Sequence, residues 1–85
     1  MSPETAKLLA CRCRTQGDFA ANAAIAQGLK NVFRTAPNWG RLTDRQREGL
    51  DMVAVKLARF LTGHPKHADH LVDAIGYLEL MRRPE

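Results

Sequence analysis

Hydrophobic residues recur along the chain at the three- and four-residue spacing of amphipathic helices, and short polar or glycine-containing segments separate these stretches. The pattern predicts helices over about 3–16, 19–35, 44–62 and 66–82. Ser2 and Asp18 are placed to cap the first two helices, and Thr43 begins a capping box for the third. We therefore expect an all-α protein, a compact bundle of about four helices that forms one domain over residues 1–85.

Each predicted helix carries an apolar stripe that we expect to face the core. The stripes are Ala6, Leu9, Ala10 and Cys13; Ile25, Leu29, Val32 and Phe33; Leu50, Val53, Leu57, Phe60 and Leu61; and Leu71, Ile75, Leu78 and Met81. Gly28 interrupts the second helix at a cost of about 1 kcal/mol relative to alanine. We interpret this glycine as a point of tight contact with a neighbouring helix.

Composition narrows the functional classes. The chain has 85 residues, 45% of them hydrophobic, and a net charge of +4, which favours anionic partners mildly. Its cations are spread out, so direct nucleic-acid binding is possible but not favoured. No apolar run is long enough to span a membrane, and the N-terminus does not have the pattern of a signal peptide, so we expect a cytoplasmic protein. Cys11 and Cys13 are interpreted as reduced, partly buried residues of a helix.

The two last helices form a predicted hairpin with a notable arrangement of charges. In an antiparallel hairpin, residues whose numbers have the same sum lie level, and here that sum is about 129. Lys56 with Asp73 gives 129, and Arg59 with Asp69 gives 128. We therefore expect two cation–carboxylate pairs between these helices. They would form either a structural clasp or a ligand site, with the cations gripping phosphate or the carboxylates holding magnesium.

Other candidate chemistry is weaker. His64, His67 and His70 are spaced by three, which permits a metal site but more simply describes an exposed, histidine-rich helix start. Trp39 lies in the connection after the second helix, where it either plugs one end of the bundle or anchors a partner. No activated nucleophile is evident, so the sequence favours a non-enzymatic protein that needs no cofactor or metal.

Several motifs resemble those of a family of small helical proteins from phages and prophages. They are Gly17-Asp18-Phe19 with Asn22-Ala23, Asn38-Trp39, Gln46-Arg47-Glu48-x-Leu50-Asp51-Met52, Lys56-x-x-Arg59, and Asp69-His70-x-x-Asp73-x-x-Gly76-Tyr77. The resemblance implies a phage or prophage origin but assigns no activity. Gln16 and Leu71 depart from the family, which has His and Trp at these positions. The candidate binding residues are Lys56, Arg59, Asp69, Asp73, Tyr77, Trp39 and Asp18.

A fainter resemblance is to the MazG-like all-α nucleotide pyrophosphatases, which bind magnesium through acidic motifs on neighbouring helices. Glu48-x-x-Asp51 and Asp69-x-x-x-Asp73 occupy corresponding helices, but the second spacing differs from that family. Two functions follow as hypotheses. The favoured one is a non-enzymatic accessory protein that binds a host protein, as an inhibitor of host defence such as an anti-CRISPR protein does, with a homodimer as a further possibility. The alternative is a nucleotide-binding or degenerate nucleotide pyrophosphatase domain that uses magnesium.

Overall fold

The protein is all-α. A computed structural model describes residues 2–7, 9, 18–64 and 69–84. Its elements are the helix α2 (Phe19–Thr35), the short 3₁₀ helix η1 (Trp39–Arg41), and the helices α3 (Asp44–Thr62) and α4 (Asp69–Arg82). Residues 3–7 and 9 are also helical, in agreement with the predicted first helix. The rest of that predicted helix, with both cysteines, and the predicted start of the last helix at 66–68 lie outside the described residues.

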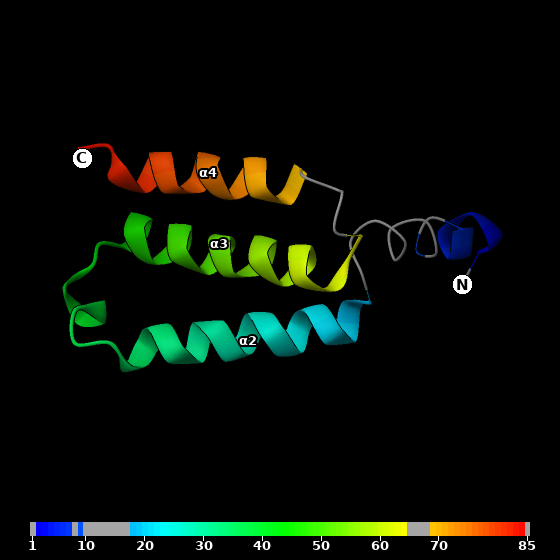
Figure 1. The fold of residues 1–85 in the computed structure, drawn as a ribbon, viewed down its shortest axis with the longest axis horizontal. Helices are drawn as coiled ribbons and strands as arrows, with labels where there is room; N and C mark the ends of the chain where they lie inside the picture. Colours follow the sequence, from blue (N-terminus) through cyan, green and yellow to red (C-terminus); the bar gives the residue numbers. More distant parts are fainter. Residues whose placement is uncertain (1, 8, 10–17, 65–68, 85) are drawn as a thin grey trace.

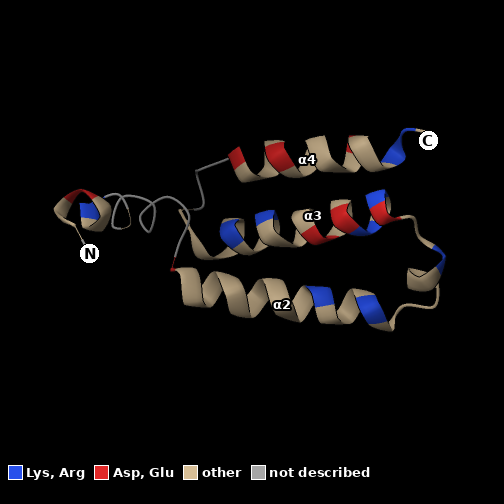
Figure 2. Ribbon diagram, turned by 180° about the vertical axis from the view of Figure 1, so that it is seen from behind, with Lys and Arg blue, Asp and Glu red and all other residues tan. Residues whose placement is uncertain are grey.

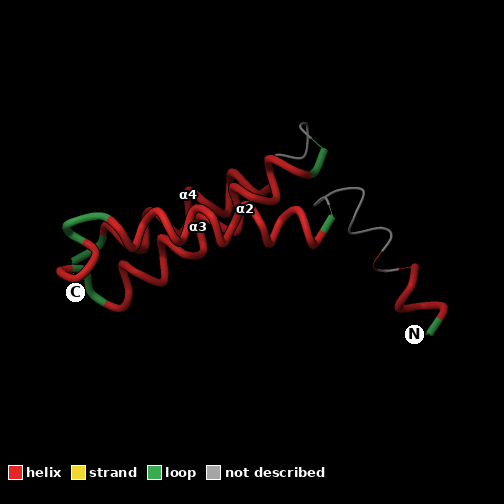
Figure 3. The backbone as a smooth tube through the Cα atoms, turned by 90° about the horizontal axis from the view of Figure 1, so that it is seen from below, coloured by secondary structure: helices red, strands yellow, loops and turns green. Residues whose placement is uncertain are grey.

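Helix α3 lies between α2 and α4 and packs against both of them (Figure 1). Each helix runs antiparallel to the next, because the connections between them are short. Seen from below, the three helices overlap as one layer (Figure 3). Among the described helices, none lies over either of the two broad faces of this layer. Among the described helices, none combines the length and the hydrophobicity that crossing a membrane requires.

The helix starts follow from local side-chain chemistry. The Asp18 carboxylate accepts a hydrogen bond from the backbone N–H of Ala21 at 3.1 Å, so this residue caps α2. The Thr43 hydroxyl accepts from the Gln46 N–H at 3.2 Å, and the Gln46 side chain accepts from the Thr43 N–H at 3.0 Å. The predicted capping box of α3 is thus confirmed. The Ser2 hydroxyl likewise accepts a hydrogen bond from the backbone N–H of Thr5 at 3.1 Å.

Small side chains fill the centre of the layer. Ala54 and Ala58 of α3 have no exposed surface, and Val53 is 8% exposed. Among the described residues, no large side chain is fully buried. A Cβ atom added to Gly49 would run into the side chain of Met81 on α4, whereas nothing lies within 4 Å of one added to Gly28. The close approach of helices predicted at Gly28 is therefore wrong, and it occurs at Gly49 instead.

The predicted core stripes are only partly correct, because the layer leaves one side of each helix uncovered. In α4 the buried residues are His70 and Ala74, while Ile75 is 67% exposed. Val32 of α2 and Leu61 of α3 are each 65% exposed. Helical periodicity identifies the apolar side of a helix, but it does not show whether another helix covers that side. In this layer much of that side faces outward, and the contacts between helices use the adjacent, small residues.

Candidate functional site

One of the two predicted charge pairs between α3 and α4 is present. The Lys56 ammonium lies 3.0 Å from the Asp73 carboxylate. The Lys56 side chain is 14% exposed and that of Asp73 is 48% exposed, so the cation is the more deeply buried partner. The contact joins the middle of the two helices and fixes their register. This pair therefore has the geometry of a clasp between helices.

The second predicted pair does not form in the described part of the structure. Arg59 instead lines a cleft that α3 forms with α2. The register was correct, but level residues pair only when both point into the same interface. Arg59 lies three positions after Lys56, which turns it by about 60° around the helix axis. Arg59 is thus separated from Asp69 and joins a different surface.

The histidines do not assemble a metal site in the described part of the chain, where no three His, Cys, Asp or Glu residues come together. His70 is buried at 4% exposure, on the side of α4 that includes Ala74. The prediction of an exposed histidine-rich helix start is therefore wrong for His70. His64 is exposed, and His67 lies outside the described residues.

Trp39 belongs to the corner that joins α2 to α3. Its ring stacks on Phe33, with ring centroids 6.4 Å apart. The guanidinium groups of Arg34 and Arg47 lie over the same ring, 4.9 and 5.9 Å from its centroid. Arg47 also donates to the backbone carbonyls of Trp39 and Gly40 at 3.2 and 3.1 Å. These contacts support the interpretation that Trp39 closes one end of the helix layer.

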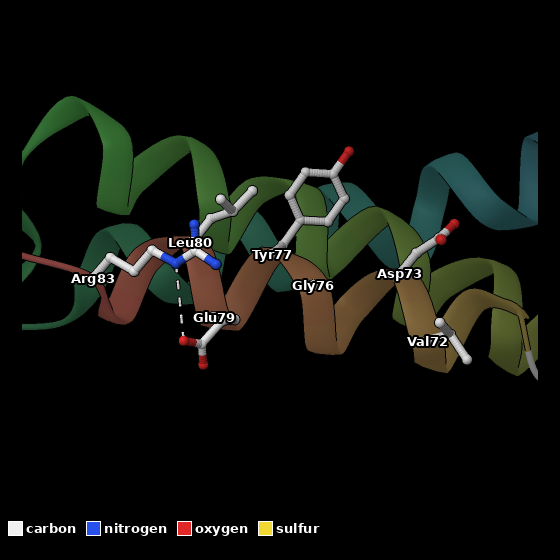
Figure 4. Close-up of a pocket in the computed structure, with 7 residues that line it drawn as sticks. All are labelled: Val72, Asp73, Gly76, Tyr77, Glu79, Leu80 and Arg83. Atoms are coloured by element: carbon white, nitrogen blue, oxygen red, sulfur yellow. Dashed lines mark ion pairs between the residues drawn. The ribbon is translucent and has the colours of Figure 1, made fainter.

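The other predicted site residues are dispersed. Asp18 caps α2 at one end of the layer. Tyr77 borders a shallow depression of about 550 Å³ along α4, together with Asp73 (Figure 4). The residues that line this depression come from α4 and from Arg83, which follows it directly, so the depression is a surface groove and not an enclosed pocket. The structure therefore brings Asp73 and Tyr77 together, and it separates both from Arg59, Trp39 and Asp18.

An ion pair at the edge of that groove is purely local. Glu79 accepts hydrogen bonds from the Arg82 guanidinium at 2.7 and 3.1 Å. These bonds lower the pKa of Glu79 from its usual 4.5, against desolvation that raises it, and the charge of Arg83 adds to the lowering. The same contact raises the pKa of Arg82. Both partners lie on one helix, so the pair supports α4 without linking it to a neighbour.

A second clasp, between α2 and α3, was missed from the sequence. Arg34 donates to the two carboxylate oxygens of Asp51 at 3.3 and 3.0 Å. Thr62 donates a hydrogen bond to the Asn22 side chain at the other end of the same helix pair. These two pairs have residue sums of 85 and 84, so the rule that indicated Lys56 and Asp73 would have found them if applied to this hairpin.

The two broad faces of the layer differ in chemistry. On one face, the cleft beside Arg59 is bordered by Gln27 and Lys30 of α2. On the opposite face, helical periodicity places apolar residues of all three helices. We call this the apolar face. Its most exposed residues are Val32 (65%), Leu61 (65%), Ile75 (67%), Leu78 (48%) and Leu71 (37%).

Charge is distributed unevenly among the helices (Figure 2). The first part of α2 has no Lys, Arg, Asp or Glu, and its charged residues are Lys30 and Arg34. Helix α3 carries both signs along its length. Hydrophobic contact is the main interaction that the exposed apolar residues of the apolar face offer.

No family model matches the chain, and neither a curated protein nor a solved structure matches it. The open apolar face and the cleft beside Arg59 are therefore the features from which a function is inferred.

Proposed function

We propose that this protein acts by binding a partner protein through its apolar face. The observation that carries the proposal is the exposure of large apolar residues from all three packed helices on the apolar face, where Ile75 is 67% exposed and Val32 and Leu61 are each 65% exposed. Contiguous apolar surface on a small protein is typical of a contact with another macromolecule. Charged residues are also scarce at the centres of protein interfaces.

The shape of the face indicates the kind of partner. Within the described residues, three antiparallel helices form a layer and leave the position that a fourth helix occupies in an ordinary bundle. An amphipathic helix laid into that position would bury Leu71 and Leu78 of α4 against its own apolar stripe. The net charge of +4 favours a partner with an acidic surface around that helix.

The resemblance to small phage and prophage proteins supports a more specific form of the proposal. In this form, the partner is a host protein in the bacterial cytoplasm, and the chain is a non-enzymatic accessory protein, such as an inhibitor of host defence. The clasps weigh against the alternative of a magnesium-dependent nucleotide pyrophosphatase. Asp51 and Asp73, two of the acids in the motifs that resemble it, are engaged with Arg34 and Lys56. Carboxylates held by cations are poorly placed to share a metal ion.

The test compares two leucines of α4. Leu78 and Leu80 are both 48% exposed, but Leu78 borders the apolar face, whereas Leu80 lines the groove on the opposite flank. The tagged full chain, Leu78→Asp and Leu80→Asp are used to capture proteins from bacterial lysate. We expect one protein to bind the wild type and Leu80→Asp and to be lost with Leu78→Asp, while circular dichroism shows all three folded.

Two results would overturn the proposal. The first is capture that is unaffected by Leu78→Asp. The second is a stable homodimer, measured by light scattering, that Leu78→Asp dissociates while no other protein is captured. In the second case the apolar face would be an interface between two copies of this chain.

A further inference from the structure

The cleft between α2 and α3 lies on the face of the layer opposite the apolar face. It has a volume of about 180 Å³. Its lining comes from both helices and consists of Phe19, Asn22, Ala23, Ala26, Gln27, Lys30, Val55 and Arg59. The lining includes two cations and two amides but no carboxylate. The cleft therefore offers hydrogen-bond donors and positive charge to whatever enters it.

The two cations in this cleft differ from their neighbours, because no acidic partner is found for them in the described part of the chain. Within the described residues, neither Lys30 nor Arg59 has an ion pair, although both side chains are partly buried. The cations that hold the layer together, Arg34 and Lys56, each contact a carboxylate. A partly buried charge without a counter-charge is unfavourable, and an anionic ligand would remove that cost.

The spacing of the cations matches a single oxyanion. Because residue sums of 84 to 85 lie level in this helix pair, Arg59 is level with residue 25 or 26 of α2. Lys30 is therefore offset from Arg59 by four or five residues, roughly 6–8 Å along the helix axis. Long side chains reaching from these two positions can meet at one group between them. Arginine suits a phosphate because its planar donor groups bind two oxygens at once.

The other end of the cleft is apolar. Phe19 is 80% exposed, and Ala23 and Ala26 lie between it and Lys30 along α2. An exposed aromatic ring beside a cationic cleft provides a surface for a ring or another apolar part of a ligand. The amides of Asn22 and Gln27 add polar contacts along the way.

We propose that the α2–α3 cleft binds a small organic phosphate. Arg59 and Lys30 hold the phosphate group, and the apolar part of the ligand lies along Ala23 toward Phe19. This site is separate from the protein-binding surface proposed above, because α2 and α3 present the cleft and the apolar face on opposite sides.

The experiment titrates the full chain with inorganic phosphate, phenyl phosphate and benzoate, followed by calorimetry and by chemical shifts of the backbone amides. We expect phenyl phosphate to bind more tightly than inorganic phosphate or benzoate, with shifts concentrated in residues that line the cleft. Arg59→Gln and Lys30→Gln should each weaken binding about tenfold, the effect of losing one charge-assisted hydrogen bond. Phe19→Ala should weaken the binding of phenyl phosphate and leave the binding of inorganic phosphate unchanged.

Arg41→Gln is the matched control, because Arg41 is an exposed cation of η1 outside the cleft. It removes the same unit of charge and should leave binding unchanged. Equal weakening by Arg41→Gln would show attraction to net charge alone and would overturn the proposal. Absence of binding by phenyl phosphate, or equal affinity for benzoate, would also overturn it. None of these outcomes bears on the partner-protein proposal, which depends on Leu78 and its neighbours.

Discussion

The Lys56–Asp73 pair makes an asymmetric prediction about stability. Replacing Asp73 by asparagine should destabilise the protein more than replacing Lys56 by methionine. The reason is the difference in burial, since the Lys56 side chain is 14% exposed and the Asp73 side chain is 48% exposed. Asp73→Asn leaves a largely buried ammonium without its counter-charge. Lys56→Met leaves a carboxylate that water can still solvate, and methionine retains the apolar stem of the lysine.

The magnitudes follow from these exposures. Breaking a fully buried pair costs about 3–5 kcal/mol, and an exposed pair contributes less than about 1 kcal/mol. For Asp73→Asn we expect an intermediate loss of about 1.5–2 kcal/mol, because one partner is buried and the other half exposed. For Lys56→Met we expect about 0.5 kcal/mol or less. The double variant should cost less than the sum, with a coupling of about 1 kcal/mol.

Urea unfolding of the wild type, both single variants and the double variant measures these quantities in one cycle. The larger loss should appear in thermal unfolding as a decrease in Tm of roughly 8 °C for a domain of this size. A Lys56→Met variant that is destabilised as much as Asp73→Asn would refute the assignment of the buried partner. Strictly additive losses would show that the two side chains do not interact in solution.

The remaining predictions concern glycines, a cap and an acid. Gly28→Ala and Gly76→Ala should each raise the free energy of unfolding by about 0.5–1 kcal/mol in urea titrations, because both positions are open. Gly49→Ala makes the same backbone change but should lower stability, because the new methyl group meets Met81. Thr43→Ala should cost about 1 kcal/mol by the same assay, through loss of the capping box. Because the pKa of Glu79 is lowered in the folded state, its ion pair contributes to stability above pH 4.5, and this contribution is lost as the pH falls through the folded pKa. The Tm difference between the wild type and Glu79→Gln should therefore shrink in acid.

Local signals predicted the helices well. The caps at Asp18 and Thr43 and the end of α3 at Thr62 depend on neighbours in sequence, and the structure confirms them. The register of α3 and α4 was also predictable, since a short connection fixes which residues lie level, and Lys56 meets Asp73 as expected. These features follow from backbone hydrogen bonding and from chain connectivity alone.

The rotation of each helix about its own axis was less predictable. An apolar stripe shows which side avoids water, but it does not show whether a neighbour covers that side. In α4 the stripe through Ile75 and Leu78 was assigned to the core, yet Ala74 and His70 face inward. Alanine and glycine permit helix axes to approach closely, but they are less hydrophobic than leucine and isoleucine. A core stripe chosen by hydrophobicity therefore passes over them. Because helix rotation was uncertain, Arg59 was also predicted to face α4, whereas in the structure it lines the cleft between α2 and α3.

Photo-crosslinking from the apolar face would test the central claim most directly. A benzoyl-phenylalanine replaces Ile75, which is 67% exposed on that face, or Leu80 on the opposite flank of α4 as the control. After illumination in the bacterial host, the account predicts a covalent adduct with one partner protein from position 75 and none from position 80. An equal adduct from both positions, or an adduct from position 75 only with a second copy of this chain, would contradict it.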